Sequence, residues 1–340
     1  MKKTLIALAA LASTAAFAQS SVTISGTFVP SFVSQKNTYG NGASVTNNSL
    51  QNNRQGTSQV TFSGTEDLGG GLKAAFLLEN DFDATNDAGN GSAATANLGS
   101  KGGELYAGLM GGFGSIKLGS PNTPTLTTQT AATPFGTKIG GGWNAMNTGH
   151  VRNNNTMVYA TPSFNGFSAT VAYSNAAKST TATTTAAITD IGLFYANGPL
   201  AAGYSNYKVD AIGAGTSNKE DNFYVTYDLG VAKIGAGYYT EKNGEAASAT
   251  VASGATDSKA YNLSVSVPMG ATTLMANYGK KDDKAAANND RTVAAIGAKY
   301  ALSKRTSVYA RYVSDKVDGT VNAALVAKST YTLVGLQHNF

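Results

Sequence analysis

Apolar and polar residues alternate along most of this chain, with the period of two that is typical of β-strands. In the segment 261–267, for example, Tyr, Leu, Val and Val alternate with Asn, Ser and Ser. Sixteen such segments are predicted as strands. They are 22–28, 59–63, 72–79, 104–109, 115–119, 156–159, 167–173, 190–195, 200–205, 222–227, 232–238, 261–267, 274–279, 293–300, 307–312 and 331–340. Each strand therefore has one mostly apolar face and one mixed or polar face.

Short and long connections alternate between the predicted strands. The short ones carry turn residues and lie at 66–71, 111–114, 161–166, 197–199, 228–230, 268–271 and 303–305. The long ones are polar and lie at 35–53, 82–103, 120–151, 176–188, 209–220, 242–258, 281–290 and 317–328. Short turns at one end and long loops at the other are the layout of a transmembrane β-barrel. The pattern predicts an all-β fold, a 16-stranded antiparallel barrel with both termini on the periplasmic side.

Tyrosines mark the ends of the predicted strands on their apolar faces. They are Tyr159, Tyr173, Tyr195, Tyr204, Tyr227, Tyr238, Tyr278, Tyr300 and Tyr312. Aromatic residues in such positions form girdles at the two interfaces of a membrane. The alternative is an exported soluble β-sandwich, a lectin or adhesin, with tyrosines at the margins of its core. The number of tyrosines on one face favours the barrel.

The first eighteen residues differ in composition from the rest of the chain. Lys2 and Lys3 precede an apolar run, and Ala16-Phe17-Ala18 fits the small-x-small pattern of a cleavage site. We predict a signal peptide at 1–18, cleaved after Ala18, and one barrel domain at 19–340. The run is too short to span a bilayer comfortably.

The remaining composition excludes several classes of protein. Without Lys2 and Lys3 the chain has 25 − 2 = 23 basic and 20 acidic residues, a net charge of +3, too mild to indicate binding to nucleic acid. It contains no cysteine and hence no disulfide. Charged residues make up 13%, well below the ~25% of soluble domains, and no later stretch approaches the ~20 apolar residues of a membrane helix. Apolar surface must therefore be accommodated by strands.

A set of motifs extends over the whole chain. They are Ser21-Val22-Thr23, GTEDLGGGLKAAFLLE at 64–79, GGFGSIKLG at 111–119, Val158-Tyr159 followed by TPSFNGF at 161–167, LSKRT at 302–306 and VGLQHNF at 334–340. Together these motifs resemble those of the general trimeric porins of Gram-negative outer membranes, of the neisserial and β-proteobacterial type. The resemblance implies a water-filled channel in the outer membrane for passive diffusion of small hydrophilic solutes and ions.

The resemblance also implies partners and special segments. The partners are two further copies of the chain in a homotrimer, outer-membrane lipid and lipopolysaccharide, and the outer-membrane assembly machinery, for which Phe340 would be part of the signal. The third long loop, 120–151, is expected to fold inward and narrow the pore. It contains Trp143, the single tryptophan, which we expect to pack the loop against the wall. The second long loop, 82–103, is expected to latch onto the neighbouring subunit.

Charges at the expected constriction predict its selectivity. No Asp or Glu occurs between Leu105 and Thr189, and parity places Lys117 and Arg152 on the inward face, opposed by Glu104. The loop itself offers Lys138. Gln59 stands where relatives are expected to carry arginine, and the element around Phe135 lacks their glutamate. The sequence therefore predicts a weak preference for anions, smaller than in relatives with a full arginine cluster.

No pattern in the sequence indicates an enzyme, a metal site or a cofactor. His150 and His338 lie far apart and lack carboxylates at metal-binding spacing, and no Ser-His or Asp-His arrangement is evident. We interpret His150 as a solvated loop residue and His338 as an interfacial strand residue. A carbohydrate-specific channel is a second alternative, because aromatic residues also face inward. These are Tyr106, Phe194, Tyr207, Tyr224, Tyr239 and Tyr309.

Overall fold

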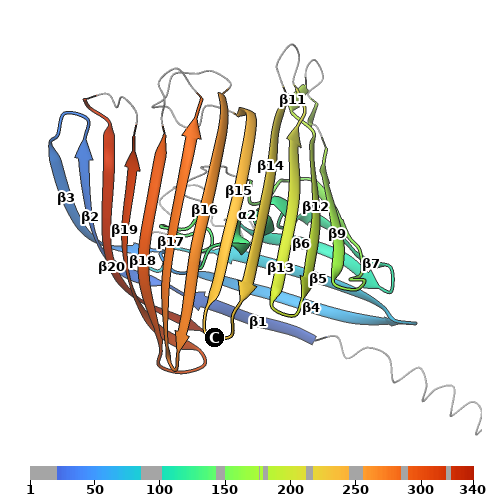
Figure 1. Ribbon diagram of the computed structural model, residues 1–340. Coiled ribbons are helices and arrows are strands. Elements are labelled where there is room, and N and C mark those ends of the chain that lie inside the picture. Colours follow the sequence, from blue (N-terminus) through green and yellow to red (C-terminus); the bar gives the residue numbers. More distant parts are fainter. Residues whose placement is uncertain are drawn as a thin grey trace, which may run out of the picture.

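The computed structural model describes residues 21–85, 102–142, 150–175, 177–178, 183–211, 217–244, 256–284, 290–318 and 323–340. Nearly all regular structure is antiparallel strand (Figure 1). The wall consists of β1 (Ser21–Phe28), β2 (Pro30–Tyr39), β3 (Ser44–Asn52), β4 (Gln59–Gly69), β5 (Leu72–Asp81), β6 (Gly102–Gly111), β7 (Gly114–Ser120), β8 (Thr156–Ala160), β9 (Phe167–Ser174), β12 (Ile188–Asn197), β13 (Leu200–Val209), β14 (Asn218–Asp228), β15 (Lys233–Gly244), β16 (Thr256–Met269), β17 (Thr272–Asp283), β18 (Arg291–Ala301), β19 (Thr306–Val317) and β20 (Val326–Asn339). Helix α2 (Pro124–Ala131) and a short hairpin of β10 (Ala177–Lys178) and β11 (Thr183–Thr185) complete the described elements.

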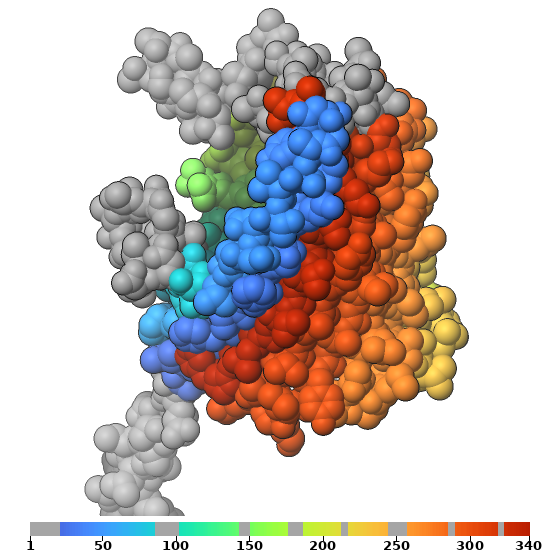
Figure 2. Space-filling view, turned by 90° about the vertical axis from the view of Figure 1, so that its left-hand side faces the viewer, coloured from blue at the N-terminus to red at the C-terminus, as the bar shows by residue number. Residues whose placement is uncertain are grey.

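The wall is one sheet that closes on itself. β20 pairs with β19 on one side and with β2 and β1 on the other. β1 and β2 continue one another across Val29, and β3 and β4 continue one another across 53–58, so the eighteen segments of the sheet form a barrel of sixteen strands. Figure 2 shows β2 in blue beside β20 in red along this seam. The predicted all-β fold, a 16-stranded antiparallel barrel, is therefore confirmed.

The two faces of the wall differ as the alternation predicts. On β19, the inward Tyr309, Arg311 and Val313 are buried, whereas Tyr312 between them is exposed. The outward residues of the other strands are mostly large and apolar, such as Leu193 and Ile296. In a membrane barrel this outward apolar band meets lipid. Within the described ranges, no helix has the length and apolarity needed to cross a bilayer.

One predicted connection is wrong. The segment 35–53 was expected to be a long polar loop, but β2 and β3 continue through it and pair from Pro30↔Asn52 to Thr38↔Ser44. Both faces of this hairpin carry Ser, Thr, Asn and Gln. Where both faces of a strand are mostly polar, apolar and polar residues do not alternate, so periodicity does not reveal the strand.

A compact apolar cluster lies inside one sector of the barrel. It joins the segment after α2, through Phe135 and Ile139, to β2, β17, β18, β19 and β20. The wall residues of this cluster are Val29, Val33, Met275, Val293, Ala295, Tyr309, Val313 and Leu333. Burial of these side chains holds the segment against the wall.

The C-terminus completes the seam. The N–H of Gly26 donates to the carbonyl oxygen of Phe340 (3.1 Å), and the N–H of Phe340 donates to that of Gly26 (3.0 Å). The Phe340 ring lies over Gly26, with Phe28 6.4 Å away between ring centroids. Asn339 bonds to Arg305 in a short turn, so the chain ends on the side of the short connections.

Gly26→Ala should destabilise the barrel. A Cβ at this position would lie 2.3 Å from the Phe340 ring and 2.5 Å from the carbonyl oxygen of Gln59. We expect the free energy of unfolding to fall by about 1–3 kcal/mol, the usual cost of overpacking. Urea unfolding of refolded barrel, followed by gel mobility without heating, measures this. Gly112→Ala is the control, because nothing lies within 4 Å of a Cβ there. Equal stability of the two variants would contradict the predicted contact.

Candidate functional site

The segment that follows β7 begins with a capped helix tied to the wall. The Thr123 side chain caps α2 by accepting from the N–H of Leu126 (3.1 Å), and Pro124 occupies the first turn. Thr125 donates its N–H and its hydroxyl to the two carboxylate oxygens of Asp190 on β12, each at 2.9 Å. Asp190 is fully buried. A carboxylate in such a place needs these donors, so the helix start and the wall depend on one another.

Further hydrogen bonds follow the segment around the polar face of the wall. Gln129 donates to Glu220 (3.3 Å) and Asn222 (3.1 Å) on β14. The carbonyl oxygen of Ala132 accepts from Asn262 and Ser264 on β16, both at 2.7 Å, and that of Gly140 accepts from Asn277 on β17 (2.9 Å). These wall residues alternate with exposed apolar residues on the same strands. The segment therefore lies on the polar side of the sheet.

Arg311 of β19 holds the far part of the segment. Its guanidinium lies 4.0 Å from the centre of the Phe135 ring and donates to the carbonyl oxygen of Ile139 (2.5 Å). It also donates to the carbonyl oxygen of Arg54 (3.1 Å) and to Gln55 (2.5 Å), in the 53–58 break between β3 and β4. Only 3% of Arg311 is exposed. Arg311 was not among the residues predicted to lie at the constriction, although its inward parity on β19 was a usable signal.

Lys138 connects the segment to the end of the 53–58 break that is nearest to β4. Its ammonium donates to the hydroxyl of Thr57 (2.7 Å). Burial lowers the pKa of Lys138 below its usual value, and the attraction of Asp81 opposes this shift only in part. Arg152, Glu79 and Arg54 also contribute to the electrostatic field at Lys138. Gln59, which was also predicted to lie at the constriction, is the register partner of Asp81 across β4 and β5.

Three other predicted residues meet at the beginning of the segment. Lys117 lies 3.6 Å from Glu104 and 4.2 Å from the centre of the Tyr106 ring. Glu104 accepts from the backbone and the side chain of Asn122, at 3.2 and 3.0 Å, and Arg152 donates to Asn122 (2.9 Å) and to the carbonyl oxygen of Gly102. The structure thus brings Lys117, Glu104 and Arg152 together. Phe135 is not part of this group and lies against the guanidinium of Arg311. Roles for these residues in selectivity stay predictions.

The interpretation of His150 as solvated is wrong. Its Nε2 lies 2.6 Å from a carboxylate oxygen of the buried Glu220, and its ring stacks on Tyr207 with 3.9 Å between centroids. Burial alone would lower the pKa of His150, but the hydrogen bond to Glu220 and the charges of Glu220, Glu241 and Asp190 outweigh it, so the pKa is raised. The pairing could not be read from the sequence because its partners are far apart along the chain.

The same histidine joins the two ends of the segment. The Thr123 hydroxyl donates to the carbonyl oxygen of His150 (2.7 Å), and the Thr123 N–H donates to that of Val151 (3.1 Å).

The cleavage site at Ala18, Trp143 and most of the 82–103 loop lie outside the described residues. The role of Phe340 in assembly stays a prediction. Among the described residues, no group of His, Asp and Glu has the arrangement of a metal site.

Comparison with known proteins identifies the family. The family model described as Gram-negative porin matches residues 4–320. The chain belongs to the Gram-negative porin family. It is 34% identical to outer membrane porin protein 32 of Delftia acidovorans, covering 97% of this chain and 94% of the relative. It is 30% identical to a major outer membrane protein P.IB of Neisseria gonorrhoeae, covering the whole of both chains.

Solved porin structures share the fold. The anion-selective porin from Comamonas acidovorans superposes with a TM-score of 0.75 at 29% identity, over 95% of this chain and 100% of that one. The trimer form of OmpT of Vibrio cholerae gives a TM-score of 0.65 at 15% identity, over 94% and 99%, which supports the fold alone. The chain is thus an outer-membrane porin that forms a channel, as predicted.

Both alternative functions lose their support. A β-sandwich requires two packed sheets, whereas the wall strands form one closed sheet. A carbohydrate channel needs accessible aromatic residues along the pore. Of the inward-facing aromatic residues, Tyr207, Tyr239 and Tyr309 are 1%, 4% and 3% exposed. Tyr207 stacks on His150, Tyr239 contacts Gln129 of α2, and Tyr309 bonds to Ser31 of β2, so these rings are covered rather than lining a path.

The raised pKa of His150 predicts how stability depends on pH. A group whose pKa is higher in the folded state contributes its full stabilisation at acid pH and loses it as the pH rises through the folded value. We expect the unfolding temperature of the wild type to fall from about pH 6.5 upward relative to that of His150→Gln. Thermal unfolding across a pH series measures the difference. His338→Gln is the control, since this histidine bonds to the Thr306 hydroxyl (2.9 Å) and to no carboxylate among the described residues. Parallel pH profiles of wild type and His150→Gln would contradict the prediction.

Proposed function

We propose that this porin is a passive diffusion channel with a weak preference for anions, narrowed by the segment 120–151 folding into the barrel. The observation that carries the proposal is the series of hydrogen bonds from Thr125 to Gly140, which ties the segment to inward-facing wall residues on β12, β14, β16 and β17. A segment fixed in this way reduces the cross-section available to solutes.

The charges near Lys138 support a weak preference. Lys138, Arg54 and Arg152 are opposed by Asp81 and Glu79, three cations against two carboxylates. Lys117 and Glu104 offset one another at 3.6 Å. A constriction selects by the sign and number of charges that face it, and salt screens charges beyond ~8 Å. A small positive excess remains, and the relative from Comamonas acidovorans is itself described as anion-selective.

Removal of two of these cations should abolish the preference. We expect Lys138→Gln with Arg152→Gln to bring the chloride-to-potassium permeability ratio to one or below. Lys304→Gln with Arg305→Gln removes the same charge from a short turn and should leave the ratio unchanged. Reversal potentials of reconstituted channels in a salt gradient measure this. A wild-type channel that favours potassium would refute the proposal and would point to control by Asp81 or Asp83.

We also propose that the functional unit is a homotrimer that associates through the outward face of β1 and β4–β7. Outward tyrosines of the described strands lie on β8–β19, and none lies on β1–β7. The outward residues there are apolar instead, and Ile24, Leu109 and Leu118 are exposed. A face without an interfacial girdle is suited to contact with protein rather than with the lipid interface.

A paired substitution tests the trimer interface. Leu118 of β7 and Leu193 of β12 are outward-facing, 56% and 52% exposed, and each lies four residues from the short-turn end of its strand. Lysine on a lipid face costs roughly 2–4 kcal/mol at the midplane. We expect Leu118→Lys to yield folded monomers and Leu193→Lys to yield trimers, measured by size-exclusion chromatography with light scattering. Trimers from Leu118→Lys would refute this interface.

A further inference from the structure

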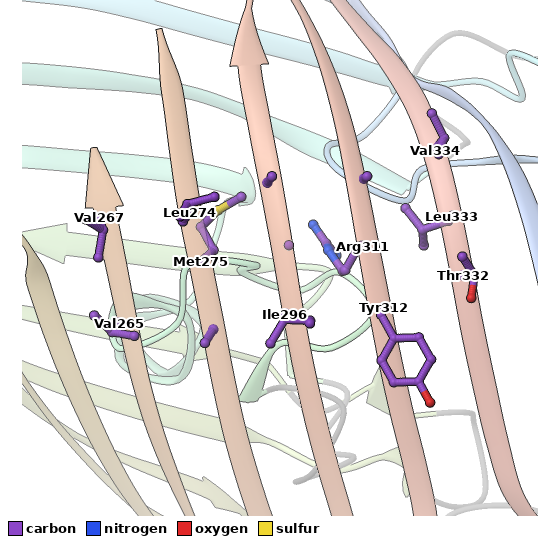
Figure 3. Close-up of a pocket in the computed structure, with 14 residues that line it drawn as sticks. Val265, Val267, Leu274, Met275, Ile296, Arg311, Tyr312, Thr332, Leu333 and Val334 are labelled. Atoms are coloured by element: carbon purple, nitrogen blue, oxygen red, sulfur yellow. The ribbon is translucent and has the colours of Figure 1, made fainter. Parts of the chain in front are cut away.

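An apolar groove of about 550 Å³ lies on the outward face of β16–β20, with Leu274, Ile296 and Val334 along it (Figure 3). This face carries the apolar band, so the groove meets lipid and a solute in the channel does not reach it. A site for a solute therefore requires inward-facing side chains. Two inward aromatic residues, Phe194 and Tyr224, are half-buried rather than covered.

Phe194 of β12 and Tyr224 of β14 form a pair of rings on the inner wall. Their parity is opposite to that of Leu193 and Val225, which are exposed on the outward face. Gly203 of β13 lies between the two rings, because Phe194 pairs with Gly203 and Gly203 pairs with Tyr224. The two aromatic residues are therefore separated by a single strand that has no side chain at this level.

Glycines allow both rings to lie against the backbone of the wall. A Cβ at Gly203 would lie 2.3 Å from the Tyr224 ring and 2.8 Å from the Phe194 ring. A Cβ at Gly192 would lie 2.6 Å from the Phe194 ring and 2.7 Å from Pro124, the first residue of α2. A ring covers a strand this closely only where no Cβ intervenes. One side of each ring thus lies against the wall, and the pair of Phe194 and Tyr224 is called the aromatic platform below.

The two edges of the aromatic platform differ. Towards the long connections, the next inward residues are Ser205 and Asn222, which are buried and bond to Thr125 and Gln129 of α2. Towards the short turns, the next register row contains Ala196, Ala201 and Gly235.

Side chains this small leave room for a solute beside the rings. The aromatic platform is therefore closed by α2 on one side and can be reached from the lumen on the side of the short turns.

Polar groups around the aromatic platform are few. Among the described residues, the Tyr224 hydroxyl has no hydrogen-bond partner, so it is available to a solute. Thr226, the next inward residue of β14, is buried. A sugar carries hydroxyl groups around its whole ring, and each loses its hydrogen bonds with water unless the site replaces them. A planar aromatic ring has no such requirement and stacks on aromatic side chains, so it suits the aromatic platform better than a sugar does.

We propose that the aromatic platform is a binding site for small hydrophilic solutes that carry a planar aromatic ring. The ring of the solute stacks on Phe194 and Tyr224 on the short-turn side of α2, and a polar substituent accepts a hydrogen bond from the Tyr224 hydroxyl. Stacking requires a π-face and tolerates different substituents, so the site recognises a class of solutes rather than one compound. Binding at this level makes the flux of that class saturable, whereas solutes without an aromatic ring pass without binding there.

Two carboxylates of equal charge test this site in the wild-type channel. Conductance of the reconstituted barrel in potassium chloride is measured while benzoate or cyclohexanecarboxylate is added. The second compound has a puckered ring without a π-face. We expect benzoate to lower the conductance in a saturable way, with a half-saturation concentration about fivefold or more below that of cyclohexanecarboxylate. Equal half-saturation concentrations of the two compounds would overturn the proposal.

Paired substitutions place the effect on the aromatic platform. Phe194→Leu with Tyr224→Leu removes both rings and should abolish the difference between benzoate and cyclohexanecarboxylate. The control, Phe223→Leu with Tyr227→Leu, removes the same two ring types from the outward face of β14 and should preserve the difference. Gel mobility without heating verifies that both variants are folded. A difference that persists without Phe194 and Tyr224 would overturn the proposal.

Two further measurements define the class of solute. Phe194→Tyr keeps both rings and should retain the discrimination of the wild type. Glucose should lower the conductance less than benzoate at equal concentration, and a larger effect of glucose would overturn the assignment to aromatic solutes. None of these substitutions changes a charge, so the chloride-to-potassium permeability ratio should stay that of the wild type. The outcome is therefore separate from the test of the charges near Lys138.

Discussion

Backbone pairing at the seam is the interaction on which the rest of the structure depends. In hydrocarbon an unpaired N–H or C=O group costs several kcal/mol, so a sheet that spans a membrane cannot have an edge. Gly26 and Phe340 exchange two backbone hydrogen bonds, and β20 continues the pairing along β2. Closure fixes the parity of every strand, because each side chain must then face either inward or outward. The distribution of chemistry over the molecule follows from that division.

The inward face depends on the 120–142 segment for its partners. Asp190 and Arg311 have ionisable side chains that are almost fully buried, and each bonds to that segment. Removing one partner from a buried charge is far more costly than the net contribution of the pair. The segment and the wall therefore stabilise one another, and a substitution in Thr125 would affect β12 as much as α2. These buried contacts, rather than the loop sequence alone, hold the segment in its position against the wall.

The sequence predicts the strands well and the partners poorly, for a physical reason. Alternation is imposed on each strand by lipid on one side, and it is absent at 35–53, where both faces of β2 and β3 are mostly polar. The parity of an inward polar residue shows which face of the strand it lies on, but it does not show which residue it contacts. His150 pairs with Glu220 seventy residues away, and Arg311 meets a break in the wall near Arg54. Those pairings are set by the register of the whole barrel, which no local pattern contains. The alternative of a carbohydrate channel fails for the same reason, because His150 stacks on Tyr207, and Phe135 and Ile139 share a buried cluster with Tyr309.

Net charge and pore charge are separate quantities in this barrel. Inward cations are largely neutralised by inward acids, as in Arg291 with Asp315 at 2.6 Å and Lys281 with Glu241 at 3.9 Å. The outward lysines have fewer carboxylate partners among the described residues. Part of the positive charge of the sequence therefore lies on the outward face, away from the path of the ions. A barrel can thus be basic overall and still discriminate only weakly between ions, since an ion in the pore responds to groups within about one Debye length of its path. The sign of the ion selectivity is therefore expected to depend on the few charges around Lys138 rather than on the net charge of the chain.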